Sequence, residues 1–326
     1  MSRIETLIPP IDGLAAQGER PAVMALAADG TRIWSGAELH AAVARLALGL
    51  AGRLRKGDAV ALYAADSPEW IAACLATIRA GAAVLPLDVQ MPEDTLAHVL
   101  ADSGARLAFT TADKLDKLSR AGGDISTWLL DVPADDARSW RALMTAPDAA
   151  NSLPAVTPED AAALFYTSGT TGLPKGVPLT HANLAFQIDA IRAAGLLDPA
   201  DRVALPLPLH HVYPFVMGVL LPVALGVPIV IPQALTGPQV VRALKEGEAT
   251  VMIGVPRLYA ALYAGIEARV AARGRRAVVV FKAMLALSTW MRRRLGLRWG
   301  RHLFAPLHRQ LAPRLHLLAC GGAALE

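Results

Sequence analysis

The chain has 326 residues, of which 54% are hydrophobic and 18% charged, so it can bury a large core and is not a disordered protein. Its length predicts two domains or subdomains. Two cysteines, Cys74 and Cys320, are too few for a disulfide framework and favour a reducing cytoplasm. The first ten residues contain no apolar segment of signal-peptide length, so we expect a cytoplasmic protein.

The formal net charge of +4 conceals an asymmetry along the chain. Between Arg257 and Arg314 there are thirteen Lys and Arg residues and one acid, Glu267, so this segment carries +12 and the remainder −8. A helical pattern covers about 267–312 and includes Trp290. Two interpretations stay open for it: a solvated amphipathic helix pair, and contact with an anionic membrane surface.

The chain alternates between short apolar runs and segments with helical periodicity. Strands are expected at 22–27, 31–34, 59–64, 82–85, 106–110, 161–167, 250–254 and 314–320, with helices at 39–50, 68–79, 92–102 and 181–194. Ser35, Ser67 and Thr180 stand where helix N-caps are expected. Such alternation predicts an α/β fold with mostly parallel sheets and right-handed crossovers. Residues 112–157 have weak periodicity and are expected to be irregular connections.

The stretch Val212–Ile231 is apolar enough to raise the question of a membrane span, which needs about 20 such residues. Prolines and glycines interrupt it repeatedly. We therefore expect a short helix near Phe215–Leu225 and a buried strand near Val227–Ile231 instead of a span.

The most distinctive stretch follows an apolar strand and reads Thr-Ser-Gly-Thr-Thr-Gly-Leu-Pro-Lys-Gly at 167–176. Glycines let backbone N–H groups converge on one point, hydroxyls add donors, and Lys175 adds a positive charge, so the loop predicts a polyphosphate site. It is not a Walker-type loop, because Lys175 follows Pro174 and precedes a glycine instead of Ser or Thr. A plain hydroxyl-rich hairpin is the alternative.

This loop resembles the phosphate-binding signature of the adenylate-forming (AMP-binding) superfamily, which includes acyl-CoA synthetases, peptide-synthetase adenylation domains and luciferases. The resemblance implies an α/β fold with two packed, mostly parallel sheets flanked by helices, as in the large N-terminal domain of these enzymes. It implies interleaved subdomains of roughly 51–200 and 1–50 plus 201–326. The basic segment at about 267–312 resembles a helical insertion of long-chain fatty acyl-CoA synthetases. The family's aromatic-Gly-x-Thr-Glu motif, ribose-binding Asp and C-terminal lid domain do not occur here, so we expect an N-terminal fragment that is inactive by itself.

The resemblance also implies site residues. Nucleotide-binding roles fall on Thr167, Ser168, Gly169, Thr170, Thr171, Gly172 and Lys175 in the loop, and on Gly321, Gly322 and Ala323, which would line the adenine and acyl pocket. Catalytic roles fall on Lys175 and on His211, which would lie beside the substrate, although a satisfied core histidine is the alternative. His210 occupies the variable position of that motif and receives no role. Gly81–Asp88 resembles a second family signature, or else is an ordinary buried strand. No residue is assigned as a metal ligand.

In the intact enzyme the resemblance implies that a carboxylate attacks the α-phosphate of ATP in the presence of Mg²⁺, and that coenzyme A then accepts the acyl group. We expect a ligase forming acid–thiol bonds that acts on a small-molecule carboxylate, a medium- or long-chain fatty acid, without a nucleic-acid partner. Peripheral membrane contact through Arg257–Arg314 and a homodimer are left open. The alternatives are a fatty acyl-AMP ligase or adenylation domain that loads a carrier protein, and a non-catalytic nucleotide-binding module.

Overall fold

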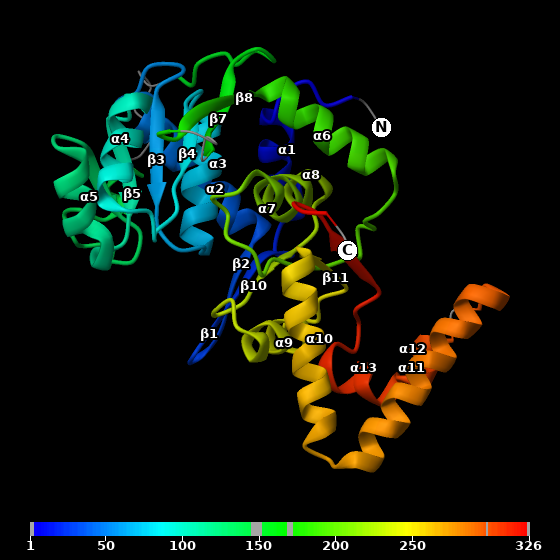
Figure 1. The fold of residues 1–326 in the computed structure, drawn as a ribbon. Helices are drawn as coiled ribbons and strands as arrows, with labels where there is room; N and C mark the ends of the chain where they lie inside the picture. Colours follow the sequence, from blue (N-terminus) through cyan, green and yellow to red (C-terminus); the bar gives the residue numbers. More distant parts are fainter. Residues whose placement is uncertain (1–2, 145–151, 168–171, 298, 325–326) are drawn as a thin grey trace. The chain divides into compact units, whose positions relative to one another are not determined.

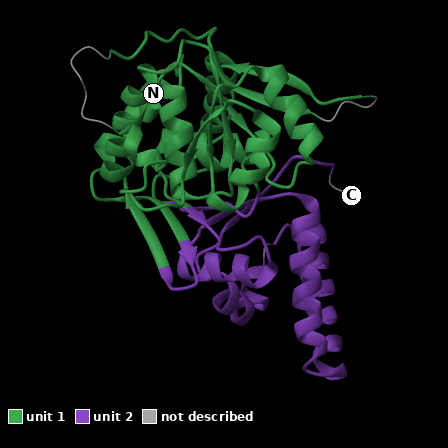
Figure 2. Cartoon of the chain, turned by 90° about the vertical axis from the view of Figure 1, so that its left-hand side faces the viewer, with its two compact units in different colours: residues 1–25, 31–200, 208–229 green, residues 26–30, 201–207, 230–326 purple. Residues whose placement is uncertain are grey.

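The computed structural model describes residues 3–144, 152–167, 172–297 and 299–324 (Figure 1). These residues form two six-stranded sheets with helices between the strands. The chain separates into two compact units (Figure 2). Unit 1 contains residues 1–25, 31–200 and 208–229, and unit 2 contains residues 26–30, 201–207 and 230–326. The expected α/β fold with two mostly parallel sheets is confirmed.

One sheet lies entirely in unit 1 and has the strand order β6-β5-β3-β4-β7-β8. Its strands are β3 (Ala59–Tyr63), β4 (Ala83–Pro86), β5 (Leu107–Thr110), β6 (Ser126–Leu129), β7 (Ala161–Thr167) and β8 (Lys175–Thr180). All neighbouring strands are parallel except β7 and β8, which form an antiparallel hairpin. Every residue of β3, β4 and β5 is buried, as expected of a parallel sheet covered on both faces.

Three helices of unit 1 begin at the caps that the sequence predicts. The helices of unit 1 are listed next. They are α1 (Ile8–Asp12), α2 (Gly36–Ala51), α3 (Pro68–Arg79), α4 (Glu93–Ser103), α5 (Leu115–Gly122), α6 (His181–Ala193), α7 (Val212–Phe215) and α8 (Leu221–Leu225), with a π-helical turn (Val216–Leu220) before α8. The side chains of Ser35, Ser67 and Thr180 accept hydrogen bonds from backbone N–H groups in the first turns of α2, α3 and α6. Of the described helices, none is long and apolar enough to cross a membrane.

The expectation of irregular structure over residues 112–157 is wrong in part, because α5 and β6 both lie there. Strand β6 is the edge of its sheet and β5 is its neighbouring strand there, so its residues are mostly half-exposed and lack a buried pattern. Helix α5 is one short helix with a single buried residue, Leu118. Strand β6 has too few buried residues to produce an alternating pattern, so its pairing with β5 decides it. Helix α5 has Leu115, Leu118 and Ala121 at helical spacing, but the pattern covers only eight residues and is too short to identify a helix by itself.

The other sheet has the strand order β12-β11-β9-β10-β1-β2. Its strands are β1 (Pro21–Ala27), β2 (Gly30–Ser35), β9 (Val203–Ala204), β10 (Ile229–Ile231), β11 (Val251–Gly254) and β12 (Leu317–Cys320). Strand β11 pairs in parallel with β9 and β12. By sheet, β1 and β2 belong with the strands after residue 201. By compact unit, most residues of β1 and β2 belong to unit 1. The subdomain boundaries expected from the sequence therefore stay a proposal.

Unit 2 also contains α9 (Gly237–Glu246), α10 (Pro256–Ala271), α11 (Arg275–Leu295), α12 (Gly300–Leu303) and α13 (Ala305–Leu311). Helices α10 and α11 form a helical hairpin joined at Gly274, whose φ of 98° is in the region that favours glycine (Figure 1). None of the described residues of α10 to α13 is buried.

Candidate functional site

The candidate site lies at the carboxyl edge of three neighbouring parallel strands of unit 1. Strands β3, β4 and β7 end at this edge and are followed there by polar residues. Asp66 follows β3, Asp88 follows β4, and Thr167 is the last residue of β7. Ligands of α/β proteins bind in the crevice beyond the carboxyl ends of parallel strands, so this edge is the expected place for a substrate.

The β7–β8 hairpin places the ends of the predicted phosphate loop together. Thr167 and Lys175 are paired across the hairpin, and both are exposed. Gly172 is exposed, and a Cβ at that position would meet no atom within 4 Å. Ser168, Gly169, Thr170 and Thr171 lie outside the described residues. The described part of the loop thus presents a hydroxyl and an ammonium group to the same edge.

Helix α4 holds both limbs of this hairpin. On the β7 side, the Tyr166 hydroxyl donates to Asp102 Oδ2 at 2.6 Å. On the β8 side, His98 Nε2 lies 3.0 Å from the carbonyl oxygen of Pro174. Burial and the hydrogen bond with Asp102 raise the pKa of Tyr166, so the phenol stays a neutral donor. The loop therefore starts and ends on fixed backbone, which favours a preorganised site.

The predicted substrate histidine, His211, is exposed and directly precedes α7. Its neighbour His210 is half-buried, and the two rings are tilted with centroids 4.3 Å apart. His210 Nε2 lies 3.9 Å from Asp88 Oδ2. Burial lowers the pKa of His210, as does His211, while Asp88 acts in the opposite direction. The structure therefore brings His210 next to a carboxylate of the site, although the sequence assigned it no role.

Asp66 is a second residue that sequence reasoning missed. Its Oδ1 accepts a hydrogen bond from the backbone N–H of Leu209 at 3.2 Å. Burial raises the pKa of Asp66 to about 7, and the hydrogen bond from Leu209 acts in the opposite direction. One signal was present in the sequence: an acidic residue three positions after a fully buried strand and one position before a helix cap.

The residues Gly321, Gly322 and Ala323 lie in unit 2, after the last residue of β12. The Gly321 N–H donates to the carbonyl oxygen of Gly254 at 3.1 Å, and Gly322 has a φ of 76°. The Tyr259 hydroxyl lies 2.7 Å from the carbonyl oxygen of Ala319. The backbone turn after β12 is thus well supported, and its role toward adenine stays a prediction.

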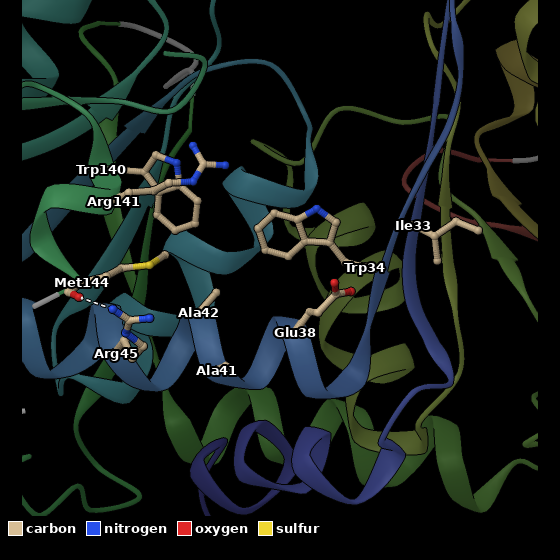
Figure 3. A pocket seen from close by; sticks show the side chains of 9 residues that line it. All are labelled: Ile33, Trp34, Glu38, Ala41, Ala42, Arg45, Trp140, Arg141 and Met144. Atoms are coloured by element: carbon tan, nitrogen blue, oxygen red, sulfur yellow. Dashed lines mark hydrogen bonds between the residues drawn. The ribbon is translucent and has the colours of Figure 1, made fainter. Parts of the chain in front are cut away.

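A hollow of about 390 Å³ elsewhere on unit 1 contains none of the predicted site residues (Figure 3). It is lined by residues of β2, α2 and the 3₁₀ turn Trp140–Leu143 together with Met144. Its charged groups already have structural partners: Arg45 donates to the carbonyl oxygen of Met144 at 3.0 Å, and the Arg141 guanidinium lies 5.0 Å from the ring centroid of Trp140. We therefore place the candidate site at the strand edge and not in this hollow.

Among the described residues, no group of three or more His, Cys, Asp or Glu side chains could hold a metal ion. A divalent cation at this edge would therefore depend on other oxygen ligands. Mg²⁺ is commonly held by substrate phosphates and water with only one or two carboxylates, which is compatible with the residues present.

With this geometry established, comparison with known proteins identifies the class. The sequence matches the family described as AMP-binding enzyme over residues 13–326, and the chain belongs to that family. The resemblance seen in the phosphate loop is confirmed.

Two curated relatives are named as a CoA ligase and a CoA synthase. The chain is 37% identical to the sulfoacetate–CoA ligase of Cupriavidus necator over 186 residues, which cover 56% of this chain and 36% of that protein. It is 34% identical to a feruloyl-CoA synthase of an Amycolatopsis species over 229 residues, which cover 70% of this chain and 45% of that protein. The chain thus spans less than half the length of either relative.

A solved structure supports the same fold. The O-succinylbenzoate coenzyme A synthetase of Bacillus subtilis, in complex with AMP, matches with a TM-score of 0.66 and 26% identity over 78% of this chain and 50% of that one. The arrangement of two mostly parallel sheets is therefore that of the large N-terminal domain of adenylate-forming enzymes.

Proposed function

We propose that the full-length protein is an ATP-dependent ligase that activates a carboxylate as an acyl adenylate and transfers the acyl group to coenzyme A. The observation that carries this proposal is the hairpin that sets Thr167 and Lys175 at the carboxyl edge of β7, in a chain of the AMP-binding family. Two relatives named as a CoA ligase and a CoA synthase support coenzyme A as the acceptor, while another relative, 34% identical over 156 residues, is named as a carrier-protein ligase.

The residues at the edge would contribute positioning and charge. The Lys175 ammonium would form charge-assisted bonds with nucleotide phosphates, and the loop hydroxyls and backbone would add donors. An ionised carboxylate substrate needs no general base. The lowered pKa of His210 indicates a histidine that is neutral at pH 7, which would orient the substrate without adding charge. We assign His211 the substrate-adjacent position and Gly321, Gly322 and Ala323 the wall of the adenine pocket.

The test is ATP–pyrophosphate exchange by the full-length protein and its Lys175→Ala variant. We expect the variant to lose about 10²–10³ in rate while it stays folded, because one preorganised contact to the reacting centre is removed. Lys245→Ala is the control, since Lys245 is an exposed lysine at the end of α9. Unchanged exchange kinetics in Lys175→Ala would refute the phosphate assignment.

The substrate class within this function is a medium- or long-chain fatty carboxylate. This narrower proposal rests on the basic helical segment, which resembles that of fatty acyl-CoA synthetases and exposes apolar side chains. A panel of carboxylates that includes decanoate, palmitate, ferulate and sulfoacetate, assayed for ATP-dependent thioester formation, distinguishes the classes. Turnover of only the short or aromatic acids would contradict the fatty-acid proposal. A cytoplasmic location and a homodimer stay predictions.

Helix α11 also supports peripheral contact with an anionic membrane. Five large apolar side chains on it are strongly exposed: Val279 at 67%, Val280 at 56%, Leu287 at 46%, Trp290 at 54% and Leu295 at 54%. Val279, Ala283 and Trp290 recur at helical spacing and so share one face. Basic residues border this face, with Arg275 and Arg276 before it and Arg292, Arg293 and Arg294 after it. A basic helix with an exposed apolar face is typical of contact with an anionic lipid surface.

Flotation with liposomes at low salt tests the membrane proposal. Attraction to anionic lipid contributes about 1 kcal/mol per basic residue near the surface, so recovery should be higher with anionic than with neutral vesicles and should fall with salt. Trp290→Ser should reduce recovery, whereas Leu235→Ser, a similarly exposed apolar residue outside the hairpin, should not. Equal recovery with both vesicle types leaves only a solvated helix pair.

A further inference from the structure

We infer that Asp66 is a positioning residue that fixes the segment carrying His210 and His211 at the substrate edge, through its hydrogen bond with the Leu209 N–H. This inference rests in part on the proposed function, since it assigns these histidines to the substrate. It concerns a residue for which neither the phosphate loop nor the histidine motif provides a role.

The backbone on the Asp66 side is rigid. Tyr63, the last residue of β3, is fully buried, and its hydroxyl donates to the carbonyl oxygen of Val89 at 3.0 Å. Ser67, immediately after Asp66, accepts a hydrogen bond from the Trp70 N–H and caps α3. Asp66 therefore lies between a core strand and a capped, buried helix, so its carboxyl group can act as a fixed anchor.

The segment on the Leu209 side is held at two points, with the histidines between them. Leu209 is fully buried, and its N–H is the donor to Asp66. Four residues after His211, the Phe215 ring packs edge-to-face on Phe165 of β7, with centroids 5.3 Å apart. The Phe215 contact fixes the end of α7, whereas the Asp66 contact fixes the chain that leads into His210. Loss of the hydrogen bond between Asp66 and the Leu209 N–H would free the chain on the N-terminal side of the two histidines.

The protonation of Asp66 should change the strength of this anchor, because an ionised acceptor makes a stronger hydrogen bond than a neutral one. Other titratable groups near this segment are His210 and His211, which follow Leu209, and Asp88, whose Oδ2 lies 3.9 Å from His210 Nε2. Glu69, in the first turn of α3, pairs with Arg32. The raised pKa of Asp66, about 7, comes from burial and is opposed only by the Leu209 N–H. The carboxyl group of Asp66 therefore ionises near neutral pH. At higher pH the ionised group holds the segment with His210 and His211 more firmly.

Two variants of the full-length protein separate the roles of the acceptor and of the charge. Asp66→Asn keeps an oxygen acceptor and removes the titration, whereas Asp66→Ala removes both. Hydrogen exchange of the peptide containing Leu209, corrected for intrinsic rates, reports the anchor without any substrate. In wild type we expect protection to rise through about pH 7. It should stay independent of pH in Asp66→Asn and fall roughly tenfold or more in Asp66→Ala, as for loss of a hydrogen bond to a charged group.

The pH profile of kcat/KM for the carboxylate in ATP–pyrophosphate exchange provides the functional readout. Asp66→Asn should lose an inflection near pH 7 that wild type shows, and Asp66→Ala should raise KM for the carboxylate more than it lowers kcat. Equal protection in wild type and Asp66→Ala, or an unchanged inflection in Asp66→Asn, would overturn the inference. If wild type shows no ATP–pyrophosphate exchange with any of the carboxylates tested, the proposed function fails. The hydrogen-exchange measurement still decides whether Asp66 anchors the segment.

Discussion

Replacement of Asp66 by Asn should make the protein more stable at pH 8 than wild type. Burial raises the pKa of Asp66 from 3.8 to about 7, so the folded protein retains a proton that the unfolded chain has lost between these pH values. Stability rises with pH only where the unfolded state binds more protons, and here the folded state binds more. The free energy of unfolding that depends on this group therefore falls as pH increases from about 4 to about 7.

The magnitude follows from the size of the pKa shift. One pKa unit corresponds to about 1.4 kcal/mol, so ionised Asp66 lowers the free energy of unfolding by at most about 4 kcal/mol above pH 7. Asn has no charge to bury and avoids this cost. Near pH 4, the contribution of residue 66 to the free energy of unfolding should differ little between wild type and Asp66→Asn. The difference should grow up to pH 8, where Asp66→Asn is the more stable protein. The same change should weaken the function of the site, as in other stability–activity trade-offs.

Urea unfolding of the full-length protein and its variant at pH 4, 6 and 8, followed by tryptophan fluorescence, measures this difference. Asp160→Asn is a control of opposite sign, since its bond with Lys56 lowers the pKa of Asp160. That carboxylate contributes stability which is present above its usual pKa and lost as pH falls, so Asp160→Asn should be the less stable variant at pH 8. Parallel stability curves for wild type and Asp66→Asn across this range would refute the reasoning.

Three further outcomes are expected. Burial lowers the pKa of His181 to about 4. About 3 kcal/mol of stability that is present above pH 6.5 should therefore be lost as pH falls toward 4. Urea unfolding of His181→Gln should not show this loss. A Cβ on Gly49 would lie 1.9 Å from the carbonyl oxygen of Leu143, so Gly49→Ala should lower the free energy of unfolding by about 1–3 kcal/mol, whereas Gly13→Ala, with open space, should be near neutral in thermal melts. Tyr166→Phe removes the bond from the loop hairpin to α4 and should raise KM for ATP in the exchange assay more than it affects thermal stability, and an unchanged KM would contradict the anchoring role.

Local sequence patterns determined the elements on which the site is built. Ser35, Ser67 and Thr180 predicted the starts of three helices because a cap depends only on a hydroxyl and the three residues that follow it. The buried strands could be predicted because a strand covered on both faces is continuously apolar. The glycine and hydroxyl composition of residues 167–176 predicted the phosphate loop, since that chemistry is contiguous in the chain.

Tertiary structure alone decided which distant side chains meet at the edge. Asp66 and Asp88 follow two consecutive strands, β3 and β4, whereas His210 comes more than a hundred residues later, and no local pattern relates the three. The pairing of β3 with β4 and the return of the chain to this edge bring Leu209 to Asp66 and His210 to Asp88. The pKa shifts of Asp66 and His210 depend on burial, which the sequence around each residue does not encode because the covering atoms come from other elements.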